Sequence, residues 1–207
     1  MTPQLILASA SPARTKLLTD AGIAHRVLVS DADEDALTAA AGPLTPAETA
    51  LLLARAKAES VAASESGALV IGCDSVFELD GVPYGKPWEP AVARERWRLM
   101  RGRSGVLHTG HWLISTTHST HDGGAPVGHG EVTSAVVTFE GVSDAEIDAY
   151  IATGEPLQVA GAFTIDGLAG AFIAGVEGDP HTVVGLSIST LRRLLAKHGV
   201  AITDFWA

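Results

Sequence analysis

Intrachain disulfides are excluded, because Cys73 is the only cysteine among the 207 residues. A lone cysteine fits the reducing cytoplasm. The sequence also lacks any apolar run near the ~20 residues that a membrane-spanning helix needs. Its first residues lack the basic segment and the long apolar core of a secretory signal. We therefore expect a cytoplasmic protein without membrane contacts.

Positive charge is scarce as well. The chain has 14 Lys and Arg residues against 24 Asp and Glu, which gives a net charge of −10. Neither a nucleic-acid polymer nor an anionic membrane is an expected partner, since both attract a basic surface. A small phosphorylated ligand is not excluded. A few Lys and Arg side chains, or one divalent cation, make a positive pocket in an acidic protein.

The most informative segment lies at the start of the chain. The apolar run 5–8 predicts a short buried strand, and a helix follows at once, with Ser11 as N-cap, Pro12 at the first helical position and Gly22 at the end. The turn between them directs unpaired backbone N–H groups and the helix dipole at one point. Arg14 lies in the first helical turn, so an anion between it and the dipole would explain its place, which indicates a phosphate site. The alternative is an ordinary turn with a surface arginine.

Further elements follow from caps, turns and hydrophobic patterning. Thr45 with Glu48 and Ser143 with Glu146 are capping boxes, and Asp80-Gly81 predicts a hairpin. Adjacent strands in hairpins, together with strands separated by helices, predict an α/β fold with a mixed sheet. We expect a mobile or variable loop from His121 onward. The other expected elements are strands over 26–30, 68–77, 106–119 and 131–139, and helices over about 46–64, 89–100, 144–153 and 187–198.

Asp74 is the residue that most needs an explanation. It interrupts a run that otherwise reads as a buried strand, where a lone carboxylate is unfavourable unless it is paired, hydrogen-bonded or bound to metal. Gly72, two residues earlier, indicates a close approach of backbone or ligand. We therefore favour a functional Asp74. The alternative is that it lies at the end of the strand and only caps a turn.

Two lysines and an acidic run supply further candidates. Lys86 stands between a glycine and a proline just after the hairpin, which suits a point charge for phosphate. Lys57 lies on an Ala- and Leu-rich helix. Either lysine could instead be an ordinary solvated side chain. Glu34 would partner Asp74 on magnesium, which takes one or two carboxylates together with phosphate oxygens; the alternative is a solvated acidic loop over 31–35.

Taken in order, these motifs resemble those of the Maf-type nucleoside triphosphate pyrophosphatases, relatives of the inosine-triphosphate pyrophosphatases. The resemblance extends from Leu5 to about Leu195. Several ordered motifs at compatible spacings are far more specific than any one of them. They are Ser9-Ala10-Ser11-Pro12-Ala13-Arg14, Lys57-Ala58, Gly72-Cys73-Asp74-Ser75, Gly85-Lys86-Pro87, Gly154-Glu155-Pro156, Ala160-Gly161-Ala162-Phe163, Ile165-Asp166-Gly167 and Val183-Val184-Gly185-Leu186.

The resemblance implies a function, a site and a fold. It implies hydrolysis of a nucleoside triphosphate to the monophosphate and pyrophosphate, with Asp74 accepting a proton from the attacking water. Ser9, Arg14, Lys57 and Lys86 would bind the triphosphate. Glu34 and Asp74 would lie near a divalent cation, Mg or Mn, with Asp33 as the alternative to Glu34. The implied fold is a single elongated, two-lobed α/β domain over 1–207, with a bent mixed sheet flanked by helices and a central cleft.

Four positions depart from relatives specific for thymidine and uridine triphosphates. Those relatives have a second arginine at Ala13, a threonine at Ser75 and a glutamine at Asp166, and a histidine often found in the family is replaced by Gly105. Ala13, Ser75 and Asp166 are therefore substrate-binding candidates. The base preference stays open, as does the oligomeric state, a homodimer included.

Three other functions compete with this one. The chain could be a non-catalytic nucleotide-binding regulator of cell division, since relatives are linked by name to septum formation. A phosphatase acting on the terminal phosphate lacks an obvious nucleophile here. Zinc is disfavoured because the spacing of the central histidines matches no zinc motif: His108, His111, His118, His121 and His129.

Overall fold

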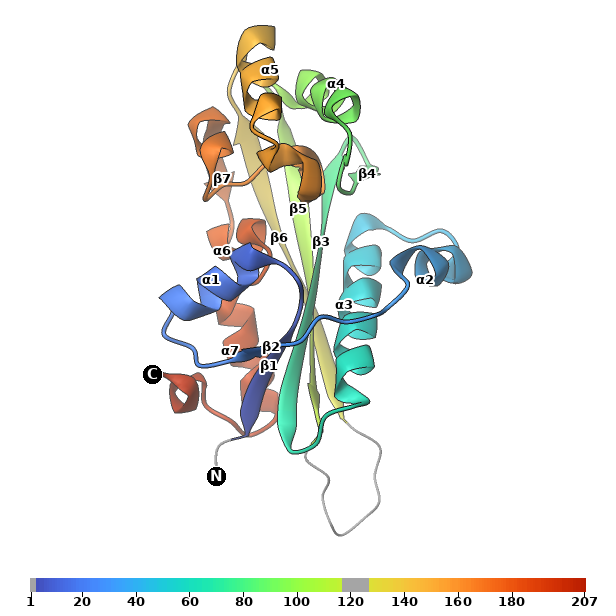
Figure 1. The fold of residues 1–207 in the computed structure, drawn as a ribbon, viewed down its shortest axis with the longest axis vertical. Coiled ribbons are helices and arrows are strands. Elements are labelled where there is room, and N and C mark those ends of the chain that lie inside the picture. The colour runs from blue at the N-terminus through green and yellow to red at the C-terminus, as the bar shows by residue number, and fades with distance from the viewer. Residues whose placement is uncertain (1–2, 117–126) are drawn as a thin grey trace.

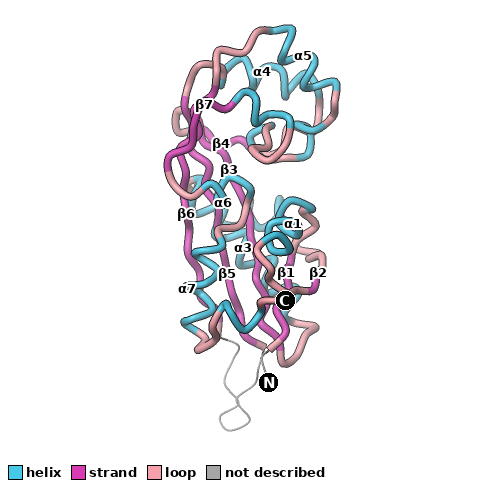
Figure 2. The backbone as a smooth tube through the Cα atoms, turned by 90° about the vertical axis from the view of Figure 1, so that its left-hand side faces the viewer, coloured by secondary structure: helices cyan, strands magenta, loops and turns pink. Residues whose placement is uncertain are grey.

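The computed structural model describes residues 3–116 and 127–207, and the expected loop from His121 onward falls outside them. The molecule is elongated and two-lobed, with three long strands running through both lobes (Figures 1 and 2). Those strands are β3 (Ala68–Leu79), β5 (Ser104–Ser115) and β6 (Gly128–Phe139). The shorter strands are β1 (Gln4–Ala8), β2 (Arg26–Val27), β4 (Val82–Tyr84) and β7 (Ile173–Glu177).

The sheet is mixed, as expected. Its order is β2-β1-β3-β5-β6-β7, and β4 pairs with β3. β1 runs parallel to both β2 and β3, whereas the pairs of β3 with β4 and β5, of β5 with β6 and of β6 with β7 are antiparallel. The β3–β4 hairpin turns at Asp80 and Gly81, both with positive φ, as the Asp-Gly signal predicted.

Helices cover the sheet differently in the two lobes. In the lower lobe, α3 (Pro46–Ala62) lies on one face, and α1 (Pro12–Asp20), α6 (Pro180–Val184) and α7 (Ile188–Lys197) lie on the other (Figure 1). In the upper lobe, α4 (Pro90–Met100) and α5 (Asp144–Ala152) pack beside an aromatic core that includes Phe77, Trp97 and Phe139. The remaining helical segments are α2 (Glu34–Ala41), η1 (Glu155–Gln158), η2 (Ala160–Ala162), η3 (Leu168–Phe172) and η4 (Ile202–Phe205).

The local signals at helix ends are confirmed. Thr45 and Ser143 both form capping boxes, and Ser11 caps α1 with Pro12 at its first position. Among the described residues, no helix has the length and apolar character to cross a membrane.

One expected strand was too long, and one helix, α2, was not expected. The strand expected over 26–30 pairs only at Arg26 and Val27. The acidic run is a loop only as far as Asp33, which caps α2 by accepting a hydrogen bond from the Ala36 N–H at 3.0 Å. Acidic residues in a first helical turn are favoured by the helix dipole, which explains why Glu34 and Asp35 begin this helix.

Glycines let α3 lie directly against the sheet. A Cβ added at Gly72 would stand 2.1 Å from the Ala54 carbonyl oxygen and 2.8 Å from the Ala58 nitrogen, and one at Gly110 would meet Ala50 at 2.3 Å. The close approach indicated by Gly72 is therefore that of a helix backbone. This contact sets the distance between β3 and α3, and thus between Asp74 and Lys57.

We expect Gly72→Ala to lower the free energy of unfolding by about 1–3 kcal/mol or more, since backbone atoms must move to admit the methyl group. Urea unfolding measures the change. Gly175→Ala on β7 is the matched control, because a Cβ there has no neighbour within 4 Å. Equal stability of the two variants would contradict this role for Gly72.

Candidate active site

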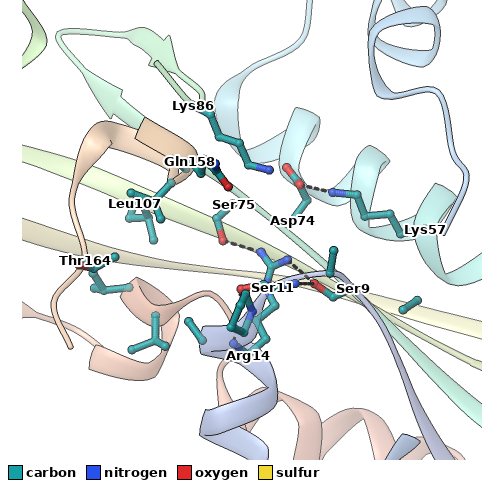
Figure 3. Close-up of a pocket in the computed structure, with 18 of the residues that line it drawn as sticks. Ser9, Ser11, Arg14, Lys57, Asp74, Ser75, Lys86, Leu107, Gln158 and Thr164 are labelled. Atoms are coloured by element: carbon teal, nitrogen blue, oxygen red, sulfur yellow. Dashed lines mark hydrogen bonds and ion pairs between the residues drawn. The ribbon is translucent and has the colours of Figure 1, made fainter. Parts of the chain in front are cut away.

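A cavity of about 400 Å³ opens between the two lobes, where β1 ends and β3 continues. β1 makes its last pair with β3 at Ala8 and Gly72, so Asp74 and Ser75 lie just beyond the end of β1. The β1–α1 turn, α3 and segments of the upper lobe surround these two residues (Figure 3). The cavity brings together all the residues predicted from the sequence: Ser9, Ala13, Arg14, Glu34, Lys57, Asp74, Ser75, Lys86 and Asp166.

Asp74, Lys57 and Glu34 form one charge cluster. The Lys57 Nζ atom lies 2.6 Å from Asp74 Oδ1 and 2.9 Å from Glu34 Oε1. The Lys57 and Asp74 side chains are only 12% and 13% exposed, so Lys57 is not a solvated surface lysine. Asp74 lies within β3 and not at its end, which excludes the turn-cap interpretation. Asp33 is engaged as the cap of α2, whereas Glu34 pairs with Lys57.

The environment of Asp74 favours proton uptake more than that of an ordinary aspartate. Burial raises the pKa of its carboxyl group, and the positive charges of Lys57 and Arg14 oppose that shift. A carboxylate whose basicity is increased by burial and held in check by two cations is a reasonable general base.

Arg14 ties together the elements on the other side of Asp74. Its Nε donates to the Gly185 carbonyl at 2.7 Å, and its two terminal nitrogens donate to Ser9 Oγ and Ser75 Oγ at 3.1 Å each. The guanidinium is buried, and among the described residues it forms no salt bridge with a carboxylate. Three of its five N–H donors are thus used by the protein. Arg14 holds the turn in place and supplies positive charge to the cavity.

Ser75 belongs to a directed chain of hydroxyl groups. Thr109 Oγ1 donates its one proton to the Thr182 carbonyl at 2.8 Å, so Ser75 Oγ, 2.9 Å away, must donate to Thr109. Ser75 also accepts from Arg14. Its proton is therefore directed away from the cavity. Ser9 Oγ, by contrast, accepts from both Arg14 and the Ser11 N–H, which leaves its own proton free to donate.

The remaining predicted residues line the cavity from other segments. Lys86 extends into the cavity from the link between β4 and α4 (Figure 3), and Asp166 is exposed on the segment before η3. Ala13 lines the cavity from the first turn of α1. At Gly105, a Cβ would stand 2.2 Å from the Phe77 ring, so Phe77 fills the space that a histidine side chain would need.

Sequence reasoning missed several residues of the site. Gln158 and Thr164 line the cavity. Glu155 organises the segment that carries Asp166, because its carboxylate accepts from Tyr150 Oη at 2.9 Å, the Leu168 N–H at 3.0 Å and the Thr164 hydroxyl. Burial raises the pKa of the Glu155 carboxyl group, but the hydrogen bonds together outweigh burial, so the pKa is lowered. The Gly154-Glu155-Pro156 motif pointed to this position in the sequence but did not indicate the role of Glu155.

The carboxylates of the charge cluster are the candidate metal ligands of the site. Among the described residues, no cluster of three or more His, Cys, Asp or Glu could hold a metal ion by itself. Of the histidines considered for zinc, His118 and His121 lie outside the described ranges. Two carboxylates, Asp74 and Glu34, do converge on a single cation, the Lys57 ammonium. Such a pair is what magnesium uses when phosphate oxygens and water complete its ligands.

Comparison with known proteins places the chain in a family. The family model described as Maf-like protein matches residues 4–198. A "Nucleoside triphosphate pyrophosphatase" of Leifsonia xyli is 54% identical, over 98% of this chain and 96% of the relative. Proteins of the same name from Streptomyces coelicolor and Mycobacterium ulcerans are 53% and 46% identical, over 100% and 99% of this chain and 98% and 97% of the relatives.

Proposed function

The chain belongs to the Maf family, and we propose that Asp74 is the general base of its hydrolytic reaction and that the surrounding cations bind the triphosphate. The protein is a nucleoside triphosphate pyrophosphatase, which hydrolyses the bond between the α and β phosphates. These relatives are named as enzymes, which weighs against the alternative of a non-catalytic regulator. The observation that carries the proposed site is the Glu34–Lys57–Asp74 cluster at the edge of a cavity of about 400 Å³.

In this proposal, Asp74 takes a proton from a water that attacks the α-phosphorus, and pyrophosphate leaves. Ser9 donates its free hydroxyl proton to a phosphate oxygen, and Lys57 and Lys86 neutralise negative charge that develops on the leaving group. Arg14 holds Ser9 and Ser75 in place and adds its charge. The three cations approach from α1, α3 and the β4–α4 link, so a bound triphosphate would contact both lobes.

The reaction depends on a divalent metal, and we propose Mg or Mn held by Asp74 and Glu34. Their carboxylates already converge on one positive charge, and the donor set of two carboxylates is incomplete without phosphate oxygens. When bound, the ion would stabilise negative charge on the phosphates. Without the ion, the positive charge of Lys57 balances the negative charge of the two carboxylates. The lone, buried Cys73 fits our further proposal of a cytoplasmic location.

Product analysis tests the proposal. We expect a panel of ordinary and modified nucleoside triphosphates to give nucleoside monophosphate and pyrophosphate, resolved by phosphorus NMR. Nucleoside diphosphate and orthophosphate as the initial products would contradict it. No turnover of any member, with binding retained, would instead favour the regulator.

Asp166 is proposed to read the base. An ionised carboxylate only accepts hydrogen bonds. It would repel a carbonyl of uracil or thymine, which is also an acceptor, but it would accept hydrogen bonds from the adjacent N–H and NH₂ of guanine. Ala13 leaves room for a larger base. Because Asp166 is exposed, we expect Asp166→Gln to shift the ratio of kcat/KM for guanosine and uridine triphosphates toward uridine by only about two- to tenfold. An unchanged ratio would mean that Asp166 points away and that specificity is broad.

A further inference from the structure

Lys86 is held in an unusual way for a lysine at a phosphate site. Among the described residues, no carboxylate lies within ion-pair distance of its Nζ atom. The contact that Lys86 does make is with the ring of Trp88, whose centroid lies 5.1 Å from Nζ. That distance is within the range of a cation–π interaction. The Trp88 ring therefore contacts the ammonium as an ion-pair partner could, but because the ring is uncharged it leaves the positive charge of Lys86 unneutralised.

Trp88, which makes this contact, has a disfavoured backbone conformation. Its φ is 61°, in the left-handed region that residues with side chains rarely occupy, and the residue is 62% exposed. Burial of the indole in a core does not explain the conformation. The Trp88 N–H donates to the Leu157 carbonyl at 2.9 Å, which holds the backbone there.

The other end of the segment is anchored too. The Gly85 carbonyl accepts from the Gly161 N–H at 3.3 Å and from the buried Arg96 guanidinium, which lies over the Tyr84 ring. The segment from Gly85 to Trp88 is thus fixed on both sides of Lys86. Its partners, Leu157 and Gly161, flank residues that line the cavity.

We propose that Trp88 is a positioning residue for Lys86: its indole face holds the ammonium at the mouth of the cleft, ready to meet the triphosphate. This inference rests on the proposed function, in which Lys86 binds phosphate. Trp88 itself is not among the residues that line the cavity, so it acts through Lys86 and not by stacking on the base. Preordering matters because a free lysine side chain loses considerable rotamer entropy when it binds.

A set of variants tests this with the full-length protein and a nucleoside triphosphate. Trp88→Gly removes the ring, and glycine adopts the left-handed backbone conformation without strain. The variant therefore measures the loss of the ring without a new backbone strain. We expect kcat/KM to fall about three- to tenfold in Trp88→Gly, and Trp88→Phe, which keeps an aromatic face, to restore most of it. Trp206→Ala is the matched control, because Trp206 is 63% exposed and lies outside the cavity; its kcat/KM should not change.

The decisive comparison uses the Lys86→Ala background, where Trp88→Gly should cause no further loss. An equal loss with and without Lys86, or a loss that varies with the base, would overturn the inference in favour of a structural or stacking role. If Trp88→Gly were fully active while Lys86→Ala was impaired, the inference alone would fail. If Lys86→Ala were itself fully active, the proposed phosphate contact of Lys86 would fail as well.

Discussion

Replacement of Asp74 by asparagine is expected to lower kcat by about 10²–10⁴-fold, the usual effect of removing a general base, and by more if metal binding is also weakened. The amide keeps the shape of the side chain but cannot accept a proton. Lys57 keeps its second carboxylate partner, Glu34, so the fold and nucleotide binding should persist. Pyrophosphate release measures the rate, and thermal unfolding checks the fold.

Asp148→Asn is the matched control for this variant. Asp148 pairs with Arg94 at 2.6 Å, the same distance that separates Asp74 from Lys57, but its side chain is 53% exposed on α5, outside the cavity. Its kcat should equal that of the wild type. Near-normal turnover in Asp74→Asn would place the general base elsewhere.

Acidification is expected to destabilise the protein through His111. This side chain is fully buried, and its Nε2 accepts a hydrogen bond from the Ser187 N–H at 2.8 Å, which requires a neutral ring. Burial, and then the charge of Arg14, lower the pKa of His111 to about 4 from an ordinary 6.5. The unfolded chain therefore takes up a proton first as the pH falls. Stability from this group is complete above pH 6.5 and is lost between pH 6.5 and 4, up to about 3 kcal/mol.

Urea unfolding of wild type and His111→Asn at pH 7.5 and 5 measures this contribution. The variant should be less stable at pH 7.5 but should lose less on acidification, because the asparagine amide does not titrate. His181→Asn, an exposed histidine on α6, serves as the control and should follow the wild type. The same pH dependence in all three proteins would rule out His111 as the source.

Local signals in the sequence predicted most of the secondary structure, because those signals act over a few residues. The caps at Ser11, Thr45 and Ser143 and the Asp80-Gly81 turn each satisfy their own hydrogen bonds or backbone angles nearby. The strand expected over 26–30 was too long because its pairing depends on where β1 ends, which lies elsewhere in the chain.

Most charged residues of the candidate site could be named from the sequence, but their arrangement could not. Lys57 and Asp74 are 17 residues apart, and Glu34 is further still; they meet because Gly72 lets α3 approach β3 and because Asp33 begins α2 beside it. Arg14 and Gly185 are separated by 171 residues. Such contacts depend on tertiary packing, which no local pattern contains. The role of Glu155 was hidden for the same reason.

The most direct test of the account is the position of oxygen from water in the products. Hydrolysis of a nucleoside triphosphate in ¹⁸O-labelled water, followed by mass spectrometry, reports which phosphorus is attacked. If water activated by Asp74 attacks the α-phosphorus, one ¹⁸O should appear in the nucleoside monophosphate and none in the pyrophosphate. Label in the pyrophosphate would mean attack at the β-phosphorus and would contradict the proposed arrangement of base, substrate and leaving group.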